Sequence, residues 1–202
     1  MEPTASDASF DPAASLHQAR DAVDALLRHP GAVQTINSLI SACAAALGAG
    51  HKLMICGNGG SACDAAHFAE ELTGRFRFDR RPLAAIACTD VGHITCTAND
   101  YGFEHVFARW VEALARPGDV VILLSTSGAS PNILKAAEAA RAAGAVTIAM
   151  LGKGGGALRG VCALELIVPG HSSDRIQELH MLVLHIMVEG IEASLQLGRA
   201  KR

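Results

Sequence analysis

The stretch LMICGNGGSACDAAHFAEEL (residues 53–72) contains a short apolar run, a glycine-rich loop and a segment of helical character, in that order. A strand-length apolar run followed by a helix is the repeating unit of a parallel sheet. Four further apolar runs of similar length follow, at residues 83–88, 120–124, 146–151 and 164–168. Because these runs are apolar throughout and do not alternate, both faces of the sheet must be covered. The pattern predicts a five-stranded parallel sheet between two layers of helices.

The segments that flank these runs have helical periodicity. Apolar residues recur at helical spacing in residues 12–27 and 33–47, and again in the long stretch 174–197. We therefore expect an α/β protein, a three-layer αβα sandwich with N-terminal helices and a long C-terminal helix. The first and last of these helices are expected to lie outside the core. Residues 1–10 are predicted to be a disordered leader and residues 11–198 a single domain.

Composition and charge exclude several classes of protein. With 50% hydrophobic and 18% charged residues, the chain of 202 residues is not intrinsically disordered. A net charge of −3 provides no basic surface for nucleic acid or anionic lipid. No apolar run reaches the ~18 residues of a membrane span, and the first residues lack the features of a signal peptide. We expect a cytoplasmic protein with no nucleic-acid or membrane partner, whose six cysteines are reduced and mostly buried.

Two of the predicted strands end in loops that suit an anion. GNGGS (57–61) and STSGASPN (125–132) each run directly into a helix. Glycines let the backbone approach an anion closely, and a helix start offers free N–H donors. Taken alone, each loop is equally typical of a turn with a serine N-cap. The P-loop ending is missing from both and the dinucleotide fingerprint is met only loosely, so a phosphosugar is favoured. The second loop contains four hydroxyls and no cation, so hydroxyl and amide donors are expected from it.

Polar side chains on two of the predicted helices are candidate site residues. His67 and Glu71 are one turn apart and share a helix face, which offers a metal two ligands or a substrate a base and a donor. The same pair is also common on solvated surfaces. The C-terminal stretch carries four polar residues among apolar neighbours: Gln177, Glu178, His180 and His185. The imidazoles of His180 and His185 need hydrogen-bond partners in such surroundings. These partners are either backbone carbonyls of the core or groups of a functional site.

These motifs resemble, in the same order, those of the bacterial phosphoheptose isomerases of the sugar-isomerase (SIS) fold. The resemblance covers about residues 12–195. Its motifs are GNGGS (57–61) with Asp64, His67 and Glu71, ANDYG (98–102), STSGAS (125–130), and IQELH (176–180) with His185.

The resemblance implies an aldose–ketose isomerase that converts sedoheptulose 7-phosphate to D-glycero-D-manno-heptose 7-phosphate through an enediol. This reaction is the first step of nucleotide-activated heptose biosynthesis. The resemblance also implies one Zn²⁺ per subunit and a homotetramer with its sites at subunit interfaces. The implied substrate-binding residues are Asn58, Gly59, Gly60, Glu71, Asn99, Asp100, Ser125, Thr126, Ser127, Ser130 and Gln177, with the serine-rich loop on the phosphate. The implied zinc ligands are His67, Glu71, Gln177 and His185, and Glu71 and His185 are the implied acid–base pair.

Two features of this implied site stay open. Gln177 and His185 are eight residues apart, or ~12 Å along a helix. One metal reaches both only if their side chains lean toward it or if they come from different subunits. A zinc-bound carboxylate is a weaker base, so either Glu71 leaves the metal when substrate binds or the zinc mainly organises the site.

Other functions of the SIS fold remain as alternatives. A non-catalytic SIS protein that binds a phosphosugar or a replication initiator needs the serine loop but no acid–base groups, so Glu71 and His185 distinguish it. An isomerase for pentose or hexosamine phosphates is disfavoured by Asn99, Asp100 and His185. A DNA-binding SIS regulator needs a helix-turn-helix domain, for which the chain has no room.

Overall fold

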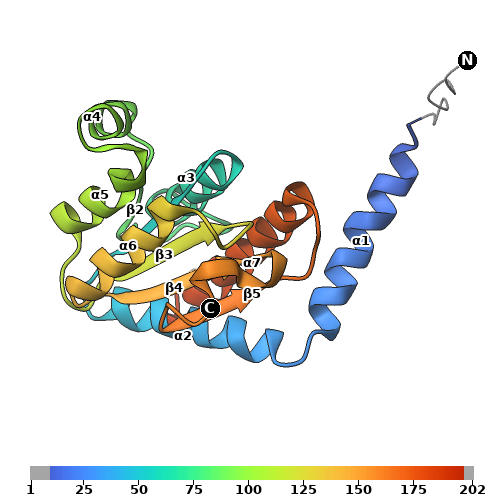
Figure 1. The fold of residues 1–202 in the computed structure, drawn as a ribbon. Helices are drawn as coiled ribbons and strands as arrows, with labels where there is room; N and C mark the ends of the chain where they lie inside the picture. The colour runs from blue at the N-terminus through green and yellow to red at the C-terminus, as the bar shows by residue number, and fades with distance from the viewer. Residues whose placement is uncertain (1–9, 198–202) are drawn as a thin grey trace, which may run out of the picture.

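The five apolar runs form one parallel sheet, and the helices cover both of its faces (Figure 1). The computed structural model describes residues 10–197, so the predicted leader lies almost entirely outside the described residues. The strands are β1 (Leu53–Gly57), β2 (Ala85–Ala87), β3 (Val120–Ser125), β4 (Val146–Leu151) and β5 (Leu164–Ile167). Their order in the sheet is β2-β1-β3-β4-β5, and every neighbouring pair is parallel. The predicted three-layer sandwich is confirmed.

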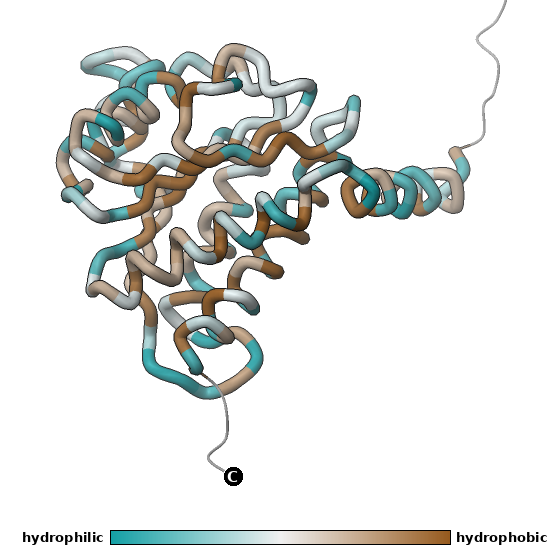
Figure 2. The backbone as a smooth tube through the Cα atoms, turned by 90° about the horizontal axis from the view of Figure 1, so that it is seen from below, coloured by the Kyte–Doolittle hydropathy of each residue, from teal (hydrophilic) through white to brown (hydrophobic). Residues whose placement is uncertain are grey.

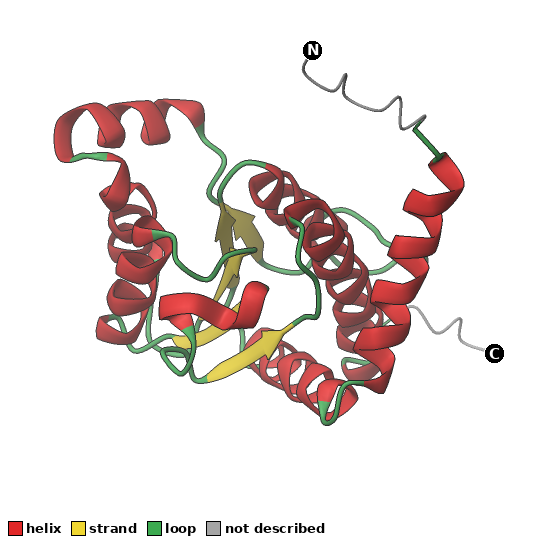
Figure 3. Ribbon diagram, turned by 45° about the vertical axis from the view of Figure 1, so that its right-hand side comes forward, coloured by secondary structure: helices red, strands yellow, loops and turns green. Residues whose placement is uncertain are grey.

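Seven α-helices and two short 3₁₀ segments connect and cover these strands within the described residues. They are α1 (Pro12–Arg28), α2 (Ala32–Gly48), α3 (Gly60–Thr73), α4 (Val91–Tyr101), η1 (Phe103–His105), α5 (Val106–Leu114), α6 (Pro131–Ala142), η2 (Lys153–Leu158) and α7 (Ser173–Ser194). Helices α2, α3 and α7 cover one face of the sheet, and α5 and α6 cover the other. Figure 3 shows the strands between these two groups of helices.

The two hydrophobic cores follow from the strand geometry. Successive residues of a strand face opposite sides, so Ile122 of β3 packs under α2, α3 and α7 while Val121 and Leu123 pack under α5 and α6. Ala136 and Ala140 are fully buried, and their small side chains let α6 lie close to the sheet. The edge strand β2 is shorter than the predicted run 83–88 because it pairs with β1 alone, over three residues.

The prediction that the C-terminal helix lies outside the core is wrong. Residues of α7 such as Val183 and Met187 are fully buried, since this helix packs with α2 and α3 in one covering layer. Helix α1 does lie outside: it extends away from the body of the molecule, and Leu16 and Leu27 are 71% and 70% exposed (Figure 2).

An apolar groove of about 200 Å³ runs between α1, α2 and α7. Its lining includes Val23, Leu26, Leu27, Val33, Leu182 and Ile186. Among residues 10–197, no single helix is both long and apolar enough to cross a membrane; only α1 and α2 taken together pass on length and composition, and they meet at 81°.

All six cysteines are free thiols, as expected for reduced residues, but only three of them are buried. Burial raises the pKa of Cys43 to about 12, so this thiol stays neutral. Cys63 on α3 and Cys96 on α4 are exposed, so the prediction that most cysteines are buried is wrong.

A buried ion pair joins the end of α3 to α7. Arg80 Nε donates to Glu192 Oε1 at 2.7 Å, and the two side chains are only 1% and 8% exposed. The same guanidinium donates to the carbonyl oxygens of Glu71 at 2.6 Å and Leu72 at 2.8 Å. These carbonyls belong to the last turns of α3 and lack helical partners. Arg80 binds both of them while it binds α7, and the Leu72 oxygen also accepts from the Leu83 N–H at 2.9 Å.

Replacing Arg80 by Leu should lower the free energy of unfolding by about 3–5 kcal/mol, because it leaves the buried carboxylate of Glu192 unpaired. Denaturant unfolding measures the change, and Arg80→Leu/Glu192→Leu should recover part of the loss. The control is Arg77→Leu, which removes a pair to Glu189 with side chains 58% and 42% exposed. In that control the free energy of unfolding should fall by less than about 1 kcal/mol. Equal losses of unfolding free energy in Arg80→Leu and Arg77→Leu would contradict a stabilising role for the buried pair of Arg80 and Glu192.

Candidate functional site

The serine-rich loop after β3 forms a turn in which its hydroxyls lie close together. Ser125 Oγ accepts a hydrogen bond from the Gly128 N–H at 3.0 Å and lies 3.4 Å from Ser130 Oγ. Ser127 Oγ accepts from the Ala129 N–H at 3.2 Å. Ser130 is the N-cap residue of α6, so the loop combines hydroxyls with the start of a helix. The arrangement can donate several hydrogen bonds to one anion.

The loop after β1 is joined to this turn by a pair of amides. Asn58 Nδ2 donates to Asn132 Oδ1 at 2.9 Å, and Asn132 Nδ2 donates back to Asn58 Oδ1 at 2.8 Å. Asn132 is buried at the start of α6. The sequence predicted Asn58 as a site residue but not its partner, because a contact over 74 positions has no local signal.

Three of the predicted metal ligands lie together on α3 and α7. His67 Nε2 is 3.2 Å from Glu71 Oε1, and the ring centroids of His67 and His185 are 5.1 Å apart. The ligand atoms of all three residues lie within 4.8 Å of one another. The Glu71 side chain is 14% exposed and that of His67 is 44% exposed, so the cluster is reached from solvent on one side. Two imidazoles and one carboxylate are a donor set that Zn²⁺ prefers.

The fourth predicted ligand, Gln177, contacts another part of α3. A Cβ atom on Gly60 would lie 2.6 Å from Gln177 Nε2, so the Gln177 amide lies directly against this glycine. Since Gly60 meets Gln177 and His67 meets His185, α3 and α7 run side by side in the same direction. Gln177 thus lies at the serine-loop end of the two helices, and its role as a metal ligand stays a prediction.

The two imidazoles of α7 have different surroundings. His180 is fully buried, and burial lowers its pKa to about 4 against an opposing effect of the Leu151 carbonyl. It is therefore neutral at pH 7 and belongs to the core. His185 is half-buried in the cluster with His67 and Glu71. His180 is buried in the core, but neither of its ring nitrogens has a hydrogen-bond partner among the described residues, so the expected bond to a backbone carbonyl is not found. His185 lies in the site.

Aromatic stacking sets the orientation of His185. The ring of Phe76 stacks on His185 at 5.8 Å with an interplanar angle of 22°. The Arg77 guanidinium lies 5.0 Å from the centroid of Phe76, and it forms an ion pair of 2.6 Å with Glu189 on α7. Neither Phe76 nor Arg77 was predicted as a site residue, although the segment RFRF (75–78) begins just after the C-cap residue of α3.

Asn99 and Asp100 lie apart from the cluster in this chain. Both are exposed at the end of α4, where Asn99 Nδ2 donates to Asp100 Oδ1 at 2.8 Å. Helix α4 packs with α5 and η1, whereas α3 and α7 cover the opposite face of the sheet. Within one chain, the structure therefore does not bring these two predicted site residues to the cluster of His67, Glu71 and His185.

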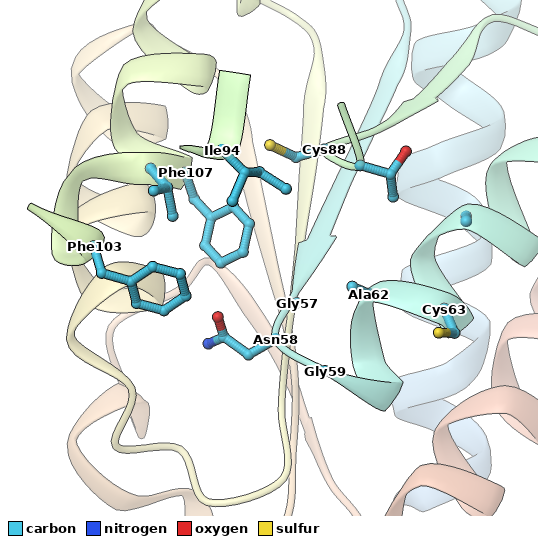
Figure 4. A pocket seen from close by; sticks show the side chains of 12 residues that line it. Gly57, Asn58, Gly59, Ala62, Cys63, Cys88, Ile94, Phe103 and Phe107 are labelled. Atoms are coloured by element: carbon cyan, nitrogen blue, oxygen red, sulfur yellow. The ribbon is translucent and has the colours of Figure 1, made fainter. Parts of the chain in front are cut away.

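A pocket of about 320 Å³ lies between the loop after β1 and the α4–α5 region. Figure 4 shows Asn58, Ile94, Phe103 and Phe107 around it. Its lining is mostly apolar, and nothing in the sequence pattern singled out Phe103 or Phe107. The pocket adjoins the start of α3, so it extends the candidate site on the side away from α7.

The chain is similar in sequence and in fold to known proteins. The family model of the SIS domain matches residues 17–152. A phosphoheptose isomerase of Fusobacterium nucleatum is 59% identical over 143 residues, which cover 71% of this chain and 74% of the relative. One from Yersinia enterocolitica is 47% identical over 178 residues and covers 88% and 92% of the two chains. The structure of the phosphoheptose isomerase of Neisseria gonorrhoeae has a TM-score of 0.84 at 37% identity and covers 90% of this chain and 96% of its own.

Replacing Phe76 by Leu should weaken metal binding by about 2- to 10-fold, which corresponds to the energy of one aromatic contact. Without the ring, the imidazole of His185 is free to rotate away from His67 and Glu71. Titration of metal-free protein with Co²⁺ measures the affinity. Phe76→Tyr keeps the ring and should bind as the wild type does, while unchanged affinity in Phe76→Leu would remove the orienting role.

Proposed function

We propose that this chain, which belongs to the SIS-domain family and within it to the phosphoheptose isomerases, is an enzyme that converts sedoheptulose 7-phosphate to D-glycero-D-manno-heptose 7-phosphate. It would thereby catalyse the first step of nucleotide-activated heptose biosynthesis. The observation that carries the proposal is the cluster of His67, Glu71 and His185 on two parallel helices. Both helices begin at the sheet edge that carries the serine-rich loop, and the cluster lies further along them. A sugar phosphate held at that edge would extend along the helices toward the acid–base groups.

The reaction needs a base and an acid close to two adjacent carbons. A base removes a proton from C1 of the ketose while O2 is protonated, which gives a cis-enediol. An acid then delivers a proton to C2 while O1 loses its proton, which gives the aldose. We assign the base to the carboxylate of Glu71 and the acid to the imidazole of His185.

We assign the remaining predicted residues to binding. The hydroxyls of Ser125, Thr126, Ser127 and Ser130 would hold the phosphate, and Asn58, Gly59 and Gly60 would contact the sugar. His67, Glu71 and His185 would hold Zn²⁺, with Gln177 as the predicted fourth ligand. When bound, the ion supplies polarisation of the sugar oxygens. In this chain Gln177 contacts Gly60, so its ligation requires either a turn of its side chain or a neighbouring subunit.

We also propose a homotetramer with sites at subunit interfaces, in the cytoplasm and without nucleic-acid or membrane partners. The apolar groove of α1, α2 and α7 supports association, because Leu27 and Ile186 are exposed beside it. The distance of Asn99 and Asp100 from the cluster supports a site completed by a second subunit.

Light scattering should give four times the mass of one chain at micromolar concentration. Leu27→Glu/Ile186→Glu should reduce that mass and the activity together, since charges in the groove oppose burial. Leu114→Glu, an exposed apolar position on α5, is the control and should stay tetrameric. A fully active monomer would contradict the proposed assembly.

The alternative is a non-catalytic SIS protein that only binds a phosphosugar or a protein partner. The cluster of His67, Glu71 and His185 argues against it, since binding alone needs no acid–base groups. Incubation of the pure protein with sedoheptulose 7-phosphate, followed by NMR, decides between the two. The aldose phosphate should appear with time, and binding without conversion would support the alternative.

Glu71→Gln keeps the shape of the side chain and removes its basicity. The variant should still bind sugar phosphate but exchange the C1 proton with solvent deuterium at least ~100-fold more slowly, as expected for loss of a general base. NMR in D₂O follows this exchange. Glu138→Gln on the exposed face of α6 is the matched control. Normal exchange in Glu71→Gln would assign the base to another group.

A further inference from the structure

Three segments that are distant in the sequence meet beside the serine-rich loop. Thr126 Oγ1 of that loop donates to Ser173 Oγ, at the start of α7, at 3.3 Å. Lys153 Nζ, from the first residue of η2 in the connection after β4, donates to the same Ser173 oxygen at 3.4 Å. The Ser173 hydroxyl therefore connects the ammonium group of Lys153 to the serine-rich loop, which contains no cation of its own.

The backbone holds Lys153 in an unusual conformation. Its φ of 48° lies in the left-handed region. Among the described residues other than glycine, only Gln196 also has a positive φ. A left-handed conformation costs an ordinary side chain about 1 kcal/mol or more, so it persists where the surroundings fix it. Strain at a residue whose charge points to a candidate site favours a functional role for that charge.

Close backbone packing fixes the loop of Lys153 on the serine-rich loop. A Cβ atom on Gly128 would lie 2.0 Å from the Gly155 oxygen, and one on Gly156 would lie 2.6 Å from the Ser127 oxygen. Neither position accepts a side chain without movement of a backbone. The two loops therefore form one rigid unit, and Lys153 does not depend on a flexible segment for its position.

We propose that Lys153 is a phosphate-binding residue of this site, which contributes the positive charge that the hydroxyls of the serine-rich loop lack. The inference rests on the proposed function, because it takes the loop to be the phosphate subsite. A phosphate dianion on Ser125, Thr126 and Ser127 would lie within reach of an ammonium that now bonds to Ser173. The carboxylate next to Ser173, that of Asp174, already pairs with Arg175 at 3.3 Å.

The test removes the charge and keeps the backbone. Asparagine tolerates the left-handed conformation, so Lys153→Asn should fold as the wild type does. Its KM for sedoheptulose 7-phosphate should rise about 10- to 100-fold, the effect of losing one charge-assisted hydrogen bond. Because the phosphate does not react, kcat should change less than about twofold. Lys153→Arg should retain most of the affinity.

Binding of inorganic phosphate provides the second measurement. Calorimetry should show the affinity of Lys153→Asn for phosphate reduced by the same factor as the KM effect. Lys135→Asn is the control. Lys135 lies on α6 near His105 of η1, so this variant should bind phosphate as the wild type does. Wild-type phosphate affinity in Lys153→Asn would overturn the inference. A wild-type protein that binds phosphate through Lys153 but converts no ketose would refute only the proposed function.

Discussion

The candidate site depends most on the hydrogen bonds that the buried guanidinium of Arg80 makes to α3 and α7. It binds the carbonyl of Glu71 and the carboxylate of Glu192 at once, and so fixes the end of α3 against α7. The two helices run in the same direction from the carboxyl edge of the sheet, which brings His67 and Glu71 to His185. A catalytic pair on separate helices needs such a connection, because small shifts between elements reduce rates strongly.

The sheet supplies the other half of the site. All its strands are parallel, so the loops after β1, β3 and β4 leave at the same edge. Glycines at 128 and 156 let two of these loops touch through their backbones. The serine-rich loop, the start of α7 and Lys153 are thereby held together. The hydrogen-bond donors for an anionic ligand are therefore in position before the ligand binds.

Local patterns predicted the fold and part of the site. Continuous apolar runs identified the strands, and the spacing of His67 and Glu71 on one helix face was visible directly. Gln177 and His185 were candidates because they lie among apolar neighbours in the sequence, and only the family resemblance assigned their roles. Phe76, Lys153 and Asn132 were missed because their roles arise from contacts with residues far along the chain. The burial of α7 was also missed, since periodicity shows that a helix has an apolar face but not which surface covers it.

In the proposed reaction, two different groups move protons through an enediol at this site. Conversion of sedoheptulose 7-phosphate in D₂O tests it most directly, with NMR of the aldose product. Separate groups predict that solvent deuterium is incorporated at C2, because His185 exchanges its proton with water before delivering it. Complete absence of deuterium from C2 would indicate direct hydrogen transfer from C1 and would contradict the account.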